Sequence, residues 1–316
     1  MKRLALCLIS IIPGLLSAQE KIEYLPYGNM NSWTVRYIKE SGLIGGRTRA
    51  LYVIAKTDTL RENKPYSYYR NGSPWGTSNA YAKVCGVEKA AVSVKPERRG
   101  TGYCCRLETS LQTVSAIGID LKAISTGSLF TGSLVDPVTI EGSKQPAKTV
   151  DMGMPFHKRP IALMLDYKAY IQENGTLVRA NASVKVKSEQ GRDAGEIILF
   201  LQHRWEDNDG NIYAYRVGTA SEHINKSINN WQNNHRLTVR YGDIRNDKDY
   251  KSWEALTTTR FMARNSQGKM VPVQEVGYRS DVEPTHLILQ ISSGCQEPFV
   301  GCPGNVVWCD NIRLVY

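Results

Sequence analysis

Two tryptophans stand among side chains that can bind sugar hydroxyls. Trp75 lies in SPWGTSN with Asn79 close behind it, and Trp231 lies among amides in INNWQNNH. The face of an aromatic ring packs against the axial C–H groups of a sugar, while neighbouring polar groups bond its hydroxyls. The three residues are therefore candidate carbohydrate-binding groups. The alternative is that each ring anchors the core or a loop.

Polar side chains also interrupt two apolar strand-like segments. Gln202 and Arg204 share one face of EIILFLQHRW, and Asp166 and Lys168 share one face of LDYKAY. Side chains two residues apart in a strand point to the same face of the sheet. One sheet face is therefore predicted to be polar and to contact a ligand, against the alternative of an ordinary solvated surface.

Local signatures of catalysis are missing from the sequence. It has no G-x-S-x-G, no H-E-x-x-H, no P-loop and no Rossmann glycine motif. The glycine-rich segment GSLFTG, 127–132, lacks the Lys-Ser/Thr ending of a phosphate loop and is predicted to be a tight turn. Paired carboxylates could hydrolyse a glycosidic bond, but 30 acids single out no pair. Binding is favoured over catalysis.

The first 18 residues have the pattern of a secretory signal peptide. Lys2 and Arg3 precede an apolar run that ends before the small residues Ser17 and Ala18. That run is shorter than a bilayer-spanning helix, and no later stretch is long and apolar enough, so no transmembrane segment is expected. We predict an exported protein of the periplasm or cell surface, whose mature chain is 19–316.

The charge of the chain bears on its partner. Removing Lys2 and Arg3 lowers the formal net charge from +10 to +8. This excess is modest and dispersed, and together with export it argues against a nucleic acid partner. It favours carbohydrate, with a preference for acidic glycans.

Six cysteines follow the predicted signal peptide, and export would permit disulfides. Cys295 and Cys302 bracket the loop sequence GCQEPFVGCPG and are the candidate disulfide pair. Cys104 and Cys105 are adjacent on a predicted strand, so only one of them can face the core. The alternative is that most of these cysteines are small buried hydrophobic residues.

These residues must be positioned by strands. Segments rich in β-branched and aromatic residues alternate with Gly, Pro, Asn and Asp clusters. The predicted strands are 49–57, 90–97, 161–171, 183–189, 196–205, 211–218, 235–243, 285–293 and 305–316. Asp209-Gly210 predicts a hairpin between two of them, and 247–256 predicts one short helix. The economical fold is all-β, a jelly-roll β-sandwich forming one domain over 19–316.

An ordered set of motifs gives the chain a resemblance to a known family. SPWGTSNAYAKV, GTGYCCRLET, STGSLFTGSL, MGMPFHKRPIALMLDYKAY, LQHRWEDNDGNIYAYRVGT and GNVVWCDNIRLVY occur in that order. They resemble the putative carbohydrate metabolism domain family of exported Bacteroidetes proteins. The resemblance implies a sandwich like that of carbohydrate-binding modules and a role in glycan use at the cell envelope. It provides no catalytic residues.

The resemblance also suggests one metal ligand. The ending WCDNIRL looks like the last strand of many jelly-roll carbohydrate-binding modules, where an Asp often binds a structural calcium. Asp310 is the corresponding residue, and its alternative role is to bond the neighbouring turn. No other cofactor is expected.

The leading hypothesis is an exported, non-catalytic glycan-binding protein. The alternatives are a glycoside hydrolase or polysaccharide lyase on the same fold, or a cell-surface adhesion protein.

Overall fold

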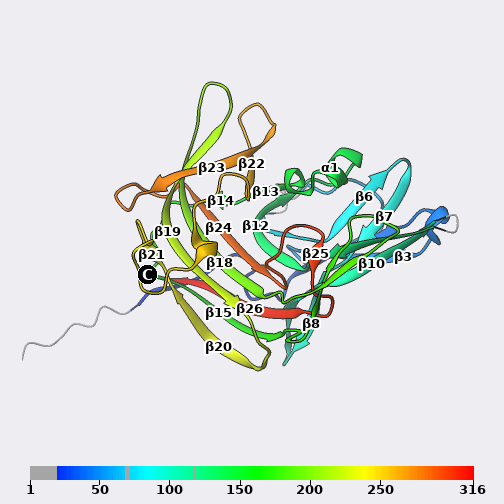
Figure 1. Ribbon diagram of the computed structural model, residues 1–316, viewed down its shortest axis with the longest axis horizontal. Helices are drawn as coiled ribbons and strands as arrows, with labels where there is room; N and C mark the ends of the chain where they lie inside the picture. Colours follow the sequence, from blue (N-terminus) through cyan, green and yellow to red (C-terminus); the bar gives the residue numbers. More distant parts are fainter. Residues whose placement is uncertain (1–19, 68–71, 117–118) are drawn as a thin grey trace, which may run out of the picture.

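Two antiparallel layers of strands dominate the computed structural model, which describes residues 20–67, 72–116 and 119–316 (Figure 1). The six-stranded sheet has the order β20 (Ile228–Thr238), β15 (Ala162–Tyr170), β26 (Val306–Val315), β9 (Gly102–Glu108) and β8 (Val94–Arg99), with β1 (Ile22–Tyr24) also paired to β26. Every pairing in it is antiparallel.

The ten-stranded sheet faces it across the core. Its order is β13 (Val150–Met152), β12 (Ser128–Leu134), β24 (His286–Ser292), β18 (Gly195–Glu206), β19 (Ile212–Ile224), β23 (Met270–Tyr278) and β22 (Met262–Arg264). β14 (Met154–Pro155), β21 (Arg240–Tyr241) and β5 (Trp75–Thr77) pair beside this path. The β19–β23 pair is parallel. The predicted all-β sandwich of jelly-roll type is confirmed.

Strand β18 is apolar on both faces because both are covered. Leu199 and Leu201 point between the sheets into the main core cluster, to which Leu165 of β15 also belongs. Ile198 and Phe200 point the other way, into a second cluster beneath β22 and β23. A strand buried on both faces reads as a continuous apolar run. Gln202 is still buried, and the cover ends beyond it, from His203 onward.

Smaller sheets surround the sandwich. They contain β2 (Trp33–Lys39), β3 (Thr48–Ile54), β4 (Asp58–Leu60), β6 (Ala80–Val84), β7 (Val87–Ala91), β10 (Ser110–Ala116), β11 (Ile119–Ser125), β16 (Thr176–Arg179), β17 (Lys187–Gln190) and β25 (Val300–Gly301). The helices are α1 (Ile140–Lys144) and the 3-10 turns η1 (Gly42–Ile44), η3 (Pro146–Thr149) and η4 (Ser252–Glu254). Within the described ranges, no helix has the length and apolar character needed to cross a membrane.

Local sequence signals had mixed outcomes. The Asp209-Gly210 hairpin is confirmed between β18 and β19, with Gly210 at φ 82°. The helix predicted over 247–256 is wrong, because only the short 3-10 turn η4 forms there. Within that turn, the Trp253 ring stacks on His223, and the Glu254 carboxylate forms an ion pair with Arg240. The turn predicted at 127–132 is also wrong, because those residues begin strand β12, whose alternate side chains fill opposite cores.

The expected disulfide between Cys295 and Cys302 is not present, and the six cysteines in the described residues are all free. Cys295 Sγ donates to Asp193 Oδ1 at 3.5 Å, while Cys302 Sγ lies 3.9 Å from the Gly191 carbonyl oxygen. The loop between them is held by backbone pairing of β25 with β16. The predicted signal peptide, 1–18, lies outside the described residues.

Candidate functional site

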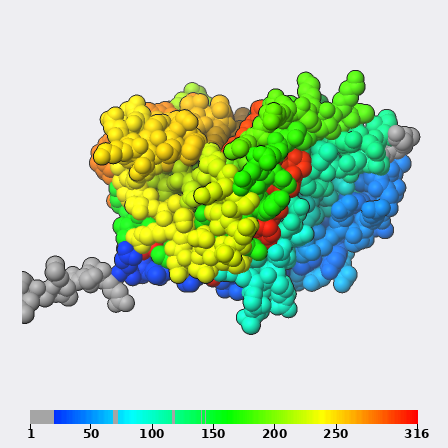
Figure 2. All heavy atoms as spheres, turned by 60° about the horizontal axis from the view of Figure 1, so that its bottom comes forward, coloured from blue at the N-terminus to red at the C-terminus, as the bar shows by residue number. Residues whose placement is uncertain are grey.

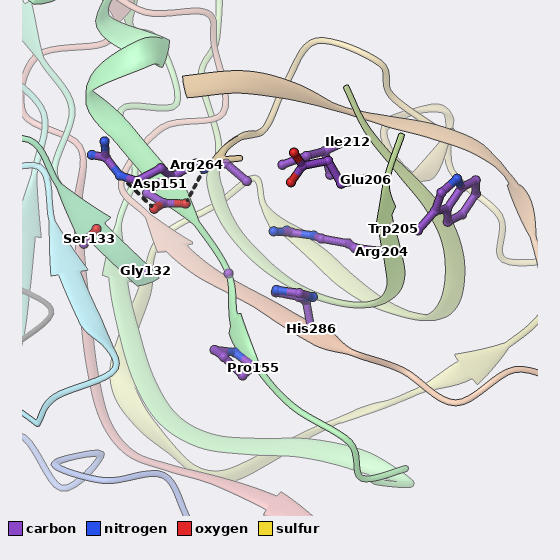
Figure 3. A pocket seen from close by; sticks show the side chains of 12 residues that line it. Gly132, Ser133, Asp151, Pro155, Arg204, Trp205, Glu206, Ile212, Arg264 and His286 are labelled. Carbon is purple, nitrogen blue, oxygen red and sulfur yellow. Dashed lines mark hydrogen bonds and ion pairs between the residues drawn. The ribbon is translucent and has the colours of Figure 1, made fainter. Parts of the chain in front are cut away.

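A cleft of about 340 Å³ opens on the face of the ten-stranded sheet that points away from the main core (Figure 3). Strands β12, β13, β14, β18, β19, β22 and β24 supply most of its lining. The lining residues are Gly132, Ser133, Asp151, Gly153, Pro155, Arg204, Trp205, Glu206, Ile212, Ala263, Arg264 and His286. The cleft is thus built from segments far apart in the sequence.

Arg204 is held in the cleft by two of its three guanidinium nitrogens. Nε donates to Gln202 Oε1 at 2.8 Å, and Nη1 donates to the Met152 carbonyl at 2.9 Å. Nη2 is buried and has no hydrogen-bond partner among the described residues. Burial lowers the pKa of Arg204 to about 10, so the side chain remains positively charged at neutral pH. Its third nitrogen is an unused donor.

Gly153 leaves the space that this guanidinium occupies. A Cβ at Gly153 would lie 2.8 Å from Arg204 Nη2, and the residue has φ 98°. A side chain there would meet both a steric clash and a strained backbone. The close approach of backbone to guanidinium therefore depends on glycine.

Polar residues beneath the cleft fix Gln202 in turn. Gln202 Nε2 donates to Glu275 Oε1 at 2.7 Å, and Arg216 Nε donates to the same oxygen at 2.6 Å. Gln202, Arg216 and Glu275 are all buried. Because a buried network with satisfied groups is rigid, it presents Arg204 in one orientation.

His286 stands beside Arg204 on the neighbouring strand, opposite Gln202 in register. Its Nδ1 bonds the Thr285 hydroxyl at 2.9 Å. Burial, together with the positive charge of Arg204, lowers the pKa of His286 to about 3. The imidazole is therefore neutral at ordinary pH, and it offers a polar ring to the cleft without adding charge.

Two carboxylates, Asp151 and Glu206, also line the cleft. Asp151 Oδ1 accepts the Arg264 amide at 3.1 Å, and its Oδ2 lies 3.9 Å from Arg264 Nε. Glu206 accepts the amide and the hydroxyl of Ser266 at 2.9 and 2.6 Å. The two acids thus anchor β22 and the turn after it. Figure 3 shows Glu206 beside Arg204, and Asp151 farther away and bonded to Arg264.

The predicted tryptophan platform at Trp75 is wrong. Trp75 has 0% of its surface exposed, and its indole N–H donates to the Pro26 carbonyl at 2.7 Å. Asn79 is also fully buried, and its side chain bonds the backbone of Tyr52, Ser93 and Val94. The hydrogen-bonding groups of Trp75 and Asn79 are bonded to the backbone of other segments, so neither side chain can contact a ligand.

Asp166, Asp310 and Trp231 lie together on the outer face of the six-stranded sheet. Asp166 of β15 and Asp310 of β26 are paired in register, and Arg99 bridges them at 2.9 and 2.7 Å. The Arg99 guanidinium carbon lies 3.9 Å from the centre of the half-buried Trp231 ring. Figure 2 shows the yellow segment that includes β20 spread over this side of the molecule.

The same face carries further rings and cations. Lys168 Nζ lies 4.5 Å from the centre of the Trp308 ring and 5.6 Å from that of Trp231. Trp308 Nε1 donates to Glu97 at 2.8 Å. Because the rings are faced by cations of the chain itself, this surface is a weaker candidate for sugar stacking than the sequence suggested.

Asp310 does not fit a calcium ion. Its Oδ2 is paired with Arg99, and its Oδ1 accepts the Asn311 amide at 2.7 Å. Calcium takes roughly six to eight oxygen ligands, whereas the described residues bring no three His, Cys, Asp or Glu side chains together as metal ligands. A guanidinium stands where a cation would have to bind.

Of the two residues that interrupt the apolar strand, Arg204 lines the cleft and Gln202 lies beneath it. Asp151, Gly153 and His286 were not predicted, because they come from distant segments of the chain. A lone histidine or glycine in a strand carries no local signal of a site. Trp205 drew no attention either, and its ring points away from the other labelled side chains and contacts Tyr213 and Tyr215 (Figure 3).

Residues 51–315 match the profile of a family described as "Putative carbohydrate metabolism domain". A crystal structure of a putative glycoside hydrolase from Bacteroides thetaiotaomicron is similar at 18% identity and a TM-score of 0.48, covering 90% of this chain and 71% of that chain. One from Bacteroides vulgatus is similar at 15% identity and a TM-score of 0.42, covering 93% and 94%. No curated protein matches significantly.

Proposed function

Because the chain belongs to the putative carbohydrate metabolism domain family, we propose that the cleft beside Arg204 binds a glycan without cleaving it. One observation carries this proposal. Arg204 Nη2 is a buried donor with no hydrogen-bond partner among the described residues, in a side chain that lines a cleft. An unpaired buried donor is costly, and an oxygen of a bound sugar would satisfy it.

The charge of Arg204 favours an acidic glycan. A carboxylate of a uronic acid would form a charge-assisted hydrogen bond with Nη2, which is about twice as strong as a neutral one. The neutral imidazole of His286 could bond a hydroxyl beside it. The preference for acidic glycans thus rests on one oriented guanidinium, rather than on the net charge of the chain. We place this binding outside the cytoplasm, in keeping with the predicted signal peptide.

The test compares a uronic acid oligosaccharide with its carboxyl-reduced neutral counterpart. Calorimetric titration with the full chain should show tighter binding of the acidic form, weakening as salt is raised. Arg204→Met should weaken that binding by roughly 10- to 100-fold, the range expected on losing a hydrogen bond to a charged group. Arg245→Met is the matched control, because Arg245 is exposed and paired with Asp243.

Three results would argue against the proposal. They are failure of both sugars to bind, equal binding of both, or unchanged affinity in Arg204→Met. A correctly folded Arg204→Met protein, judged by circular dichroism, is needed for the last comparison.

A hydrolase acting in the same cleft is the second candidate, because Asp151 and Glu206 both line it. Glycosidases use two carboxyl groups that flank the scissile bond. This alternative predicts new reducing ends from a bound oligosaccharide, and their loss in both Asp151→Asn and Glu206→Gln. Binding without any release of reducing ends would favour the first proposal.

A further inference from the structure

Cys105 and Cys309 face each other across two neighbouring strands. β9 and β26 are antiparallel, and the register pairs Cys309 directly with Cys105. Both residues have 0% of their surface exposed, and both belong to the core cluster between the two main sheets. Their side chains therefore point to the same side of the same sheet.

This arrangement meets the spacing of a disulfide. Directly opposed residues of antiparallel strands have Cα atoms about 4.5 or 5.5 Å apart, and disulfides span Cα separations of roughly 4.4–6.8 Å. A hydrogen bond to Cys105, together with burial, also raises the pKa of the Cys309 thiol. The strand register, rather than this shift, makes the two cysteines a candidate pair.

The other described cysteines have different surroundings. Cys104 lies on the opposite face of β9, with its Sγ 3.5 Å from the Glu97 carbonyl oxygen. Cys85 is exposed, in the turn between β6 and β7. Cys295 and Cys302 bond Asp193 and the backbone of Gly191, as described above. The register thus distinguishes one pairing that the sequence left open.

We propose that Cys105 and Cys309 form a cross-strand disulfide when the chain folds in an oxidising compartment. Two thiols lose two protons and two electrons, and a disulfide oxidant such as oxidised glutathione accepts them and becomes two thiols. Reaction proceeds through a mixed disulfide on one cysteine, which the other cysteine then displaces. Because both sulfurs are buried in the folded chain, the oxidant must act before the core closes.

The bond would tie the last strand to the first half of the chain. β26 lies in the middle of the six-stranded sheet, between β15 and β9, and carries Asp310 and Trp308 on its outer face. A link between distant parts of the chain restricts the unfolded state. The oxidised protein should therefore resist denaturation better than the reduced one.

Mass spectrometry of the full chain tests the proposal directly. The chain is refolded with oxidised and reduced glutathione, denatured with iodoacetamide but no reductant, and cleaved with chymotrypsin. Cleavage after Tyr103 and Trp308 separates Cys309 from Cys295 and Cys302. The expected product is a peptide pair linked through Cys105 and Cys309, about 2 Da lighter than the two free thiol peptides and resolved by reductant.

Variants separate the two adjacent cysteines. Cys104→Ser should retain the link, whereas Cys105→Ser should abolish it and leave Cys309 alkylated. Reductant should lower the urea midpoint of the oxidised wild-type chain and leave that of Cys105→Ser unchanged. Alkylation of both cysteines in the refolded wild-type chain, or a link to any other cysteine, would overturn the proposal. If a variant fails to fold, fragmentation of the wild-type linked peptides between Cys104 and Cys105 identifies the bonded cysteine.

Discussion

Nε of Arg204 donates to Oε1 of Gln202 at 2.8 Å, so the residue beneath the cleft sets the direction of the residue inside it. Both side chains come from β18 and point to the same face. Gln202 is anchored below by Glu275. A strand that contributes to two cores along most of its length thus ends in a polar pair, whose arginine lines the cleft and keeps one buried nitrogen unpaired.

Replacing Gln202 should affect both stability and binding. Gln202→Leu leaves the Arg204 Nε donor unpaired and removes one of the two donors to Glu275 Oε1, at a cost of about 1–3 kcal/mol. Affinity for the acidic oligosaccharide should also fall, because Arg204 loses its support. Urea denaturation and calorimetric titration measure the two effects. Gln267→Leu, at an exposed position, should change neither, and unaltered binding in a folded Gln202→Leu protein would contradict the positioning role.

A methyl group at Gly153 should disturb binding specifically. Gly153→Ala places Cβ 2.8 Å from Arg204 Nη2 at a residue with φ 98°. Gly268→Ala is the matched control, because Gly268 has φ 78° and nothing within 4 Å of its Cβ position. Both variants should lose about 1 kcal/mol of stability through backbone strain. Only Gly153→Ala should bind the acidic glycan more weakly than the wild type. Equal affinities of the two variants would show that a methyl group at position 153 does not displace Arg204.

His286 should make the protein less stable in mild acid. Its pKa is about 3 in the folded chain against an ordinary value of 6.5, so the unfolded chain binds the extra proton first. The free energy of unfolding should therefore fall as the pH drops from about 6.5 towards 3, by up to about 5 kcal/mol from this residue. Urea titrations across that range should show a shallower decline in His286→Gln. Parallel curves for His286→Gln and wild type would rule the effect out.

Arg99 should be a major stabilising residue of the six-stranded sheet. Burial alone would raise the pKa of Asp166, but hydrogen bonds from Asn234, Asn311 and Arg99 outweigh it and lower that pKa. At Asp310, burial outweighs the hydrogen bond from Arg99, so the pKa is raised. Arg99→Leu would leave two buried carboxyl groups without their shared cation. We expect a loss of about 3–5 kcal/mol in urea denaturation. Arg245→Leu, which breaks an exposed pair, should stay within about 0.5 kcal/mol of wild type, and a similarly small loss for Arg99→Leu would refute this role.

Segments rich in β-branched and aromatic residues identified most of the large strands, because such side chains pack well in a buried sheet. The segments 161–171, 196–205, 285–293 and 305–316 correspond to β15, β18, β24 and β26. The errors arose where tertiary contacts outweigh local preference. The segment 247–256 is helical in composition, but Trp253 and Glu254 are held by His223 and Arg240. Glycines at 127 and 132 suggested a turn, but pairing with β24 and β5 makes the residues between them a strand.

By itself, the sequence determined the all-β class, the hairpin at Gly210, the family resemblance and the polar pair Gln202 and Arg204. These features depend on residue types and on spacing along a short stretch of chain, so residues close in sequence are enough to predict them. Only the tertiary structure decided which tryptophans are buried, that Arg99 bridges Asp166 and Asp310, and that Cys105 opposes Cys309. Those relationships join strands from distant parts of the chain, and register between such strands is set by packing of the two cores. The cleft is of the same kind, because its Asp151, Gly153, Arg204 and His286 meet only when the ten-stranded sheet is complete.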